Sequence, residues 1–140
     1  MFSYVQQFTG ALPAGGTTLT SATELAYMTS PASLSVPPPD IGVVIRGYVN
    51  ATAGATGTAF TIKCRRGSGT GGTQVGVSNT HTVANNANAS IPFAFVDPTP
   101  VAPFAPSSVY TVTVTAVGAN GTAVDGQLEV CVPATGGTDT

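Results

Sequence analysis

Apolar and polar residues alternate along most of this chain, a pattern typical of β-strands with one buried face. The clearest alternation runs through residues 109–117, where Tyr110, Val112 and Val114 are separated by threonines. No segment of helical length places its apolar residues three and four positions apart. Alternation of the same kind predicts further strands at residues 41–50, 59–66, 74–83, 89–97 and 126–132.

Three segments carry signals beyond plain alternation. Residues 41–50 are largely apolar on both faces, which predicts a central strand or one at an interface. Pro92 removes a backbone donor from its strand and therefore predicts an edge strand or a bulge. Residues 21–28 fit either a short capped turn of helix or a strand.

The turn residues predict how these strands connect. Asn120-Gly121 is a strong hairpin signal, because both residue types tolerate a positive φ. We therefore expect the strand at 109–117 to pair antiparallel with the one that begins near residue 124. The strands at 41–50 and 59–66 are expected to form a second hairpin across the Gly- and Thr-rich loop between them.

Proline-rich segments divide the chain into parts. Residues 97–107 predict a long connection that crosses from one sheet to another, as in a Greek key or jelly roll. Pro37-Pro38-Pro39 is a stiff connector. The predicted organisation is an N-terminal arm at residues 1–36, a sandwich body at 37–132 and a flexible tail at 133–140. The predicted fold class is all-β, an antiparallel, jelly-roll-like β-sandwich with an extended N-terminal arm.

Composition narrows the function. Only 7% of the 140 residues are charged, whereas soluble domains average about 25%. Such a surface indicates either a threonine-dominated solvent face or, as we favour, a subunit that its neighbours cover in an assembly. A net charge of −2 gives no electrostatic basis for binding nucleic acid. The chain shows neither a Sec signal peptide nor an apolar run of about 18 residues that would span a membrane.

The sequence supplies little for catalysis or cofactor binding. His81 is the single histidine, no Gly-x-Ser-x-Gly motif accompanies it, and the six carboxylates are scattered. Residues 67–72 match the G-x-G-x-x-G pattern but precede no predicted helix, which the phosphate-binding mechanism requires. We therefore predict no enzyme activity, no catalytic residues, no metal and no cofactor. Strand alternation places Cys64 inward and Cys131 outward, which predicts free thiols, as in a protein made in a reducing cytoplasm.

Candidate contact residues fall into three groups. Residues 63–66 hold most of the four basic side chains and predict either a contact with an acidic partner or a solvated strand face. Aromatic residues near the N-terminus are suited to adding a strand to a neighbour's sheet. The third group lies on the second face of residues 41–50. The candidate protein-contact residues are Phe2, Tyr4, Phe8, Arg46, Tyr48, Lys63, Arg65 and Arg66.

Three segments together resemble small virion structural proteins of tailed bacteriophages. They are residues 43–76 (VVIRGYVNATAGATGTAFTIKCRRGSGTGGTQVG), 89–97 (ASIPFAFVD) and 109–116 (VYTVTVTA). The shared pattern is a strand ending in Ile-Arg-Gly, a Gly/Thr loop, a strand with Arg-Arg-Gly, and a Phe-x-Phe strand. Members with assigned roles include head decoration, or cement, proteins, which are often trimeric β-sandwiches on the capsid.

The resemblance implies a non-enzymatic protein that decorates and stabilises the capsid of a phage virion. Its implied partners are the major capsid protein and copies of itself in a homotrimer, on the capsid surface after synthesis in the host cytoplasm. The alternative is a receptor- or glycan-binding module of a tail fibre or other appendage. That alternative requires exposed aromatic side chains, for which the sequence offers Tyr4, Tyr27 and Tyr48.

Overall fold

The computed structural model describes residues 3–8, 17–29, 43–67, 69–97 and 110–133, all of them in strands or short connections. Every regular element in these ranges is a β-strand. The strands are β1 (Ser3–Phe8), β2 (Thr17–Leu19), β3 (Glu24–Thr29), β4 (Val43–Ala53), β5 (Thr58–Arg66), β6 (Thr73–Val83), β7 (Asn88–Asp97), β8 (Tyr110–Val117) and β9 (Gly121–Pro133).

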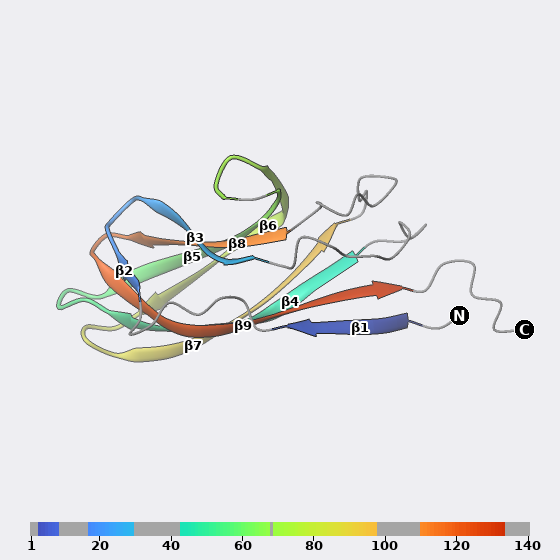
Figure 1. Cartoon of the computed structure of the whole chain (residues 1–140). Helices are drawn as coiled ribbons and strands as arrows, with labels where there is room; N and C mark the ends of the chain where they lie inside the picture. The colour runs from blue at the N-terminus through green and yellow to red at the C-terminus, as the bar shows by residue number, and fades with distance from the viewer. Residues whose placement is uncertain (1–2, 9–16, 30–42, 68, 98–109, 134–140) are drawn as a thin grey trace, which may run out of the picture.

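The strands form two antiparallel sheets that pack face to face (Figure 1). The first, called sheet A here, has the order β1-β9-β4-β7, with the short β2 also paired to β9. The second, sheet B, has the order β3-β8-β5-β6. The antiparallel pairs β1–β9, β3–β8, β4–β7 and β5–β6 nest inside one another along the sequence. This is the wrapping of a long double ribbon into a sandwich, so the predicted jelly-roll-like fold is confirmed.

The core fills the space between the inner faces of the two sheets. β5 and β7 alternate between buried and more exposed residues along nearly their whole length. Phe60, Ile62 and Ile91 are fully buried, and the rings of Phe93 and Phe95 pack 5.6 Å apart between centroids. Each large buried side chain stabilises the fold by roughly 1.5–3 kcal/mol relative to its exposed state. Period-two patterning therefore identified the core-facing residues of these strands correctly.

The strand positions predicted for individual segments also hold. β4 lies between β9 and β7, as its apolar sequence predicted. β7, which contains Pro92, is an edge strand. Residues 24–29 form the strand β3 rather than a turn of helix. β7 belongs to sheet A and β8 to sheet B, so the proline-rich segment between them joins the two sheets as predicted, although residues 98–109 lie outside the described part of the chain.

Both predicted hairpins are wrong. β8 lies in sheet B and β9 in sheet A, and in the same way β4 and β5 lie in different sheets. Gly121 is required for another reason than a tight turn, because a Cβ there would lie 2.7 Å from the ring of Phe60. Asn120 accepts a hydrogen bond on its side chain from the Ser21 amide and one on its carbonyl from the Thr58 hydroxyl. The Asn-Gly pair therefore ties the two sheets together at the end of the sandwich.

Strands from the predicted N-terminal arm belong to the sandwich of their own chain. Ser3–Phe8 pairs with β9 in sheet A, and Glu24–Thr29 pairs with β8 in sheet B. β3 carries a bulge at Tyr27, between the positions of Ala26 and Met28. The arm thus adds strands to both sheets. The domain boundaries at residues 36 and 132 stay predictions.

Candidate functional site

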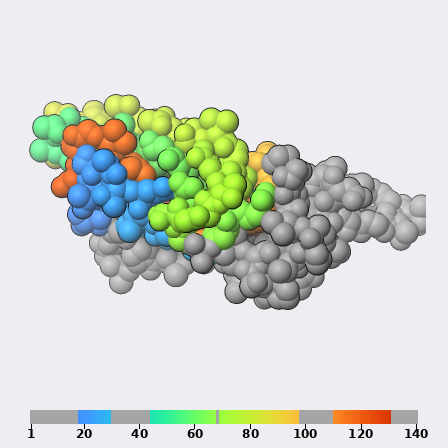
Figure 2. All heavy atoms as spheres, turned by 90° about the horizontal axis from the view of Figure 1, so that it is seen from above, coloured from blue at the N-terminus to red at the C-terminus, as the bar shows by residue number. Residues whose placement is uncertain are grey.

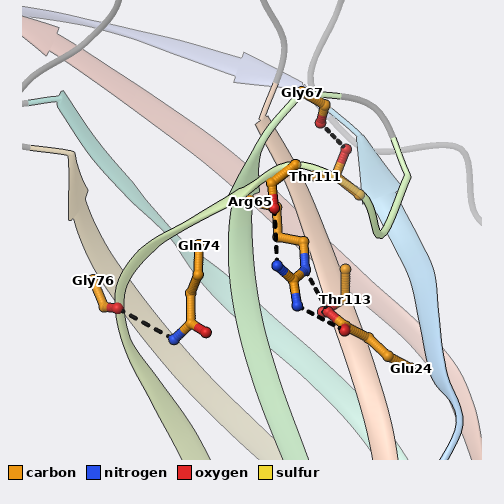
Figure 3. Close-up of polar contacts among 8 residues, drawn as sticks. Glu24, Arg65, Gly67, Gln74, Gly76, Thr111 and Thr113 are labelled. Carbon is orange, nitrogen blue, oxygen red and sulfur yellow. Dashed lines mark hydrogen bonds and ion pairs between the residues drawn. The ribbon is translucent and has the colours of Figure 1, made fainter.

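The outer face of sheet B carries an ion-pair cluster that joins three strands (Figure 3). Arg65 on β5 donates from Nε to Glu24 Oε1 at 2.7 Å and from its terminal nitrogen to Oε2 at 2.8 Å, a bidentate arrangement. The Thr113 hydroxyl on β8 donates to Glu24 Oε1 at 2.6 Å. These bonds, led by those from Arg65, lower the pKa of Glu24 to about 2 against the opposing effect of burial. Glu24 thereby holds the edge strand β3 against β8 and β5.

The same cluster holds the loop that joins β5 to β6. The remaining terminal nitrogen of Arg65 donates to the carbonyl of Gly72 at 2.9 Å, and the Thr111 hydroxyl donates to the carbonyl of Gly67 at 2.6 Å. A Cβ on Gly72 would lie 2.1 Å from the carbonyl oxygen of Arg66, so only glycine fits there. The G-x-G-x-x-G match is followed by the strand β6 and not by the helix that phosphate binding would require.

Seen from above, residues of β3 in blue lie beside those of the β5–β6 loop and β6 in green (Figure 2). On β8, the strand between β3 and β5, Thr111 and Thr113 are 0% exposed. Their positions alternate with Val112 and Val114, which face the core. β8 is therefore buried on both faces over this stretch, although its threonines predicted a solvent-facing side.

A second ion pair bridges the two sheets. Asp97, at the end of β7, accepts hydrogen bonds from Arg66 Nε at 3.0 Å and from an Arg66 terminal nitrogen at 2.6 Å. It also accepts one from the Tyr110 hydroxyl at 2.8 Å. Burial and then the hydrogen bond to Asp97 raise the pKa of Tyr110 far above its usual range. The Asp97 side chain is only 1% exposed, so this network is an internal connection between β7, β5 and β8.

Cys64 lies near this network and is free and buried, as predicted. Burial, with a further contribution from the charge of Asp97, raises the pKa of its thiol to about 12. A thiol of this kind is unreactive, because the thiolate is the nucleophilic form. Cys131 lies in the other sheet, and its side chain is outside the described residues.

The outer face of sheet A is a more open surface. Arg46 on β4 pairs with Glu129 on β9 at 2.7 Å, and the Arg46 side chain is 55% exposed. Tyr48, two residues further along β4, is 37% exposed on the same face. One groove of about 320 Å³ is lined by Arg46, Tyr48 and Glu129 among others. Another of about 530 Å³ is lined by residues that include Asn50 and Asp125.

The predicted contact residues therefore fall into different settings. Arg46 and Tyr48 come together on the open face of sheet A. Lys63 and Arg65 share the outer face of sheet B, where the charge of Lys63 also helps to lower the pKa of Glu24. Arg66 points the other way, toward Asp97, as strand alternation predicted. Phe2 lies outside the described residues, and Tyr4 and Phe8 lie on β1 with undescribed side chains.

The sequence did not identify Glu24 and Asp97 as the carboxylates that bind Arg65 and Arg66. Glu24 lies 41 residues from its partner Arg65, and Asp97 lies 31 residues from Arg66. Glu24 begins β3, Asp97 ends β7, and the two arginines are the last two residues of β5, which is a weak signal in a single sequence. Tyr27 is buried rather than exposed, and burial with the nearby charge of Asp125 raises its pKa.

The described part of the chain does not bring the remaining candidate catalytic or metal-binding side chains together. His81 is exposed on the edge strand β6. Within the described ranges, no three His, Cys, Asp or Glu side chains gather as they would around a metal ion. A search of the same residues for a helix long and apolar enough to cross a membrane finds none.

Comparison with known proteins shows similarity in structure only. No protein-family model matches the chain, and no curated protein matches its sequence. VP2 of the infectious bursal disease virus subviral particle aligns with a TM-score of 0.56 and 13% identity, over 94% of this chain and 33% of VP2. The infectious bursal disease virus Gx strain structure aligns with a TM-score of 0.49 and 15% identity, over 99% of this chain and 34% of that one.

An arabinose-bound α-L-arabinofuranosidase also aligns, with a TM-score of 0.49 and 12% identity, over 91% of this chain and 22% of the enzyme. The chain thus spans about a third of the viral proteins that it matches. At these identities the likeness concerns the fold. The chain has a jelly-roll-like β-sandwich, a fold similar to the part of VP2 with which it aligns.

Proposed function

We propose that this protein is a non-enzymatic structural component of a tailed-bacteriophage virion, which decorates the capsid and stabilises it through subunit contacts. The observation that carries the proposal is the nested strand order of a jelly roll, in a chain whose fold is similar to part of the viral protein VP2. The low charge content supports a surface that is partly covered by neighbours. The assignment to a tailed bacteriophage and the decoration role rest on the sequence resemblance.

The proposed partners are the major capsid protein and two further copies of this chain in a homotrimer. Arg46 and Tyr48 are the candidate contact residues that the described surface presents most openly. Arg65 and Arg66 engage carboxylates of their own chain, so their part in a contact would be to hold the surface in shape. Each bound subunit would resist rupture, because separating the capsid proteins beneath it would require breaking its interfaces as well.

The non-enzymatic part of the proposal draws support from the placement of polar groups. Glu24 and Asp97 are each engaged by an arginine and a hydroxyl group, which leaves them poorly suited to proton transfer. His81 stands exposed on β6. A His81→Ala protein that retains every measurable property is the expected result.

Quantitative mass spectrometry of purified virions tests the role. We expect hundreds of copies per particle, and we expect virions that lack the protein to rupture at a lower temperature. The double variant Arg46→Ala with Tyr48→Ser should lower the number of bound copies, whereas His81→Ala serves as the matched surface control. A handful of copies per virion would contradict decoration and favour a tail appendage, and a monomer by light scattering would contradict the trimer.

A further inference from the structure

The larger groove on sheet A lies away from the end where the chain enters β1 and leaves β9. Ser3 pairs with Pro133 at that end, whereas the groove is formed by the other halves of β4, β7 and β9 (Figure 1). Its volume of about 530 Å³ is within the roughly 300–1,000 Å³ range of small-molecule sites. The lining residues are Asn50, Ala51, Thr52, Asn88, Ala89, Ser90, Val124 and Asp125.

The polar groups of this groove are arranged in rows across the sheet. Asn50 faces Ser90 on one side and Asp125 on the other, and its side-chain amide donates to Asp125 Oδ1. In the next row, the Thr52 hydroxyl donates to Asn88 Oδ1 at 2.7 Å. These bonds orient the amides and leave further N–H donors, the second carboxylate oxygen and the Ser90 hydroxyl to face a ligand. The groove therefore presents donors and acceptors side by side.

Apolar groups border the same groove. A bulge in β9 leaves Val124 without a partner on β4, and its side chain is 45% exposed at the groove. Tyr48 stands in the adjacent row on the same face, about 7 Å along the strand from Asn50. A half-exposed ring beside a row of amides and hydroxyls is suited to a ligand with one polar edge and one C–H face.

The charges of the groove restrict the ligand further. Asp125 is the only charged side chain among the described residues that line the groove, so this part of it would repel phosphate and carboxylate ligands. A single carboxylate is also a poor site for a divalent cation, which takes six or more oxygen ligands in the case of calcium. Vicinal hydroxyl groups, each both a donor and an acceptor, match the paired amide and carboxylate groups.

We propose that this groove binds a neutral saccharide. Asp125 would accept a hydrogen bond from one sugar hydroxyl, and the Asn50 amide would donate one to an adjacent hydroxyl. Tyr48 would cover a C–H face of the sugar ring. The proposal shares Tyr48 with the proposed virion contact, but it is tested on the isolated chain, so its failure and the failure of the virion role are distinguishable.

The test is a titration of the isotope-labelled full chain with glucose, galactose, N-acetylglucosamine, their β-linked disaccharides and glucuronic acid, monitored by amide NMR shifts. We expect millimolar binding of at least one neutral sugar, with shifts centred on Asn50, Asn88, Ser90 and Asp125. Asp125→Asn should weaken that binding about tenfold or more, since it removes a charge-assisted acceptor while keeping the side-chain shape. Glu129→Gln makes the same change in net charge on the same face of β9 and should bind normally.

Several results would overturn the proposal. One is the absence of shift changes with every neutral sugar up to solubility. Another is a preference for glucuronic acid, which would show that the ligand is anionic. Equal weakening by Glu129→Gln and Asp125→Asn would show that the effect is one of general charge rather than of this groove. Because all variants are compared as folded proteins by their spectra, a folding defect is separated from a loss of binding.

Discussion

The two outer faces of the sandwich carry similar side chains in different surroundings. On sheet B, Arg65 and Glu24 are 17% and 20% exposed, and the threonines beside them on β8 are fully buried. On sheet A, Arg46 pairs with Glu129 across the strands β4 and β9 but keeps a side chain that is 55% exposed. The Arg65–Glu24 pair is partly buried and joins the edge strand β3 and the β5–β6 loop to the sheet. The Arg46–Glu129 pair has a 16% exposed Glu129 side chain but an open Arg46, and it connects two neighbouring strands in the middle of sheet A.

This contrast distinguishes polar side chains that connect elements of their own chain from polar side chains that remain exposed enough to contact a partner. Both arginines bind a glutamate with two nitrogens, but Arg65 contacts both carboxylate oxygens of Glu24, whereas Arg46 contacts a single oxygen of Glu129. The Arg65–Glu24 pair also engages other parts of the chain. Glu24 also accepts from Thr113, and Arg65 also donates to Gly72. A polar residue on this fold is therefore a candidate for function only after its bonds to other elements have been taken into account.

The largest effect is expected at Asp97, the most buried carboxylate among the three ion pairs of the described residues. Asp97→Ala would leave Arg66 without its bidentate acceptor and the Tyr110 hydroxyl without its acceptor at Asp97. Breaking a buried pair in this way costs roughly 3–5 kcal/mol of unfolding free energy. Urea unfolding measured by circular dichroism would check the loss. A loss below about 1 kcal/mol, similar to that of an exposed pair, would contradict the proposed link between the sheets.

An intermediate effect is expected at Glu24, and it should depend on pH. The folded protein holds the pKa of Glu24 at about 2, below the ordinary value of 4.5. A carboxylate with a lowered pKa stabilises the fold above its unfolded-state value, and this contribution is lost as the pH falls from about 4.5 toward about 2. Glu24→Gln should lower stability at neutral pH by about 1–2 kcal/mol, because its hydrogen bonds are no longer charge-assisted.

Urea midpoints of the wild type and of Glu24→Gln, measured between neutral pH and pH 2, would resolve this contribution. The difference between the two proteins should be constant above about pH 5 and should shrink below it. Glu129→Gln is the matched control on the open face. If Glu24→Gln and Glu129→Gln gave the same pH dependence, the distinction between the two faces would be wrong.

The sequence predicted where strands lie more successfully than how they pair. Alternation is a local property, so the inward residues of β5, β7 and β8 could be assigned from their spacing. Pairing depends on contacts between distant segments, and Asn120-Gly121 illustrates the limit. The chain does reverse between β8 and β9, but it does so by crossing from sheet B to sheet A, and the glycine accommodates the Phe60 ring. A turn signal cannot distinguish reversal within a sheet from reversal between two sheets.

The candidate sites were predictable to a similar extent. Strand parity correctly separated Lys63 and Arg65 from Arg66, since only neighbours along one strand are involved. It could not identify Glu24 and Asp97 as their partners, because those contacts depend on the order of strands in the sandwich. The groove at Asn50 and Asp125 could not be predicted either, because it is formed by three strands that are distant in the sequence and by one bulge.

The smallest effect on stability is expected at Arg46, and this is where the comparison of the two faces becomes most informative. Arg46→Ala should change the unfolding free energy by less than about 1 kcal/mol, because exposed ion pairs are weak in water and are screened by salt. Arg65→Ala, its counterpart on sheet B, should cost more, since it also releases the β5–β6 loop from Gly72. Urea unfolding at low and high salt would measure both. If Arg46→Ala proved as destabilising as Arg65→Ala, the open face would be a structural element too. If it leaves stability unchanged while lowering the number of copies bound to virions, then the exposure of Arg46 reflects a contact with another protein rather than with its own chain.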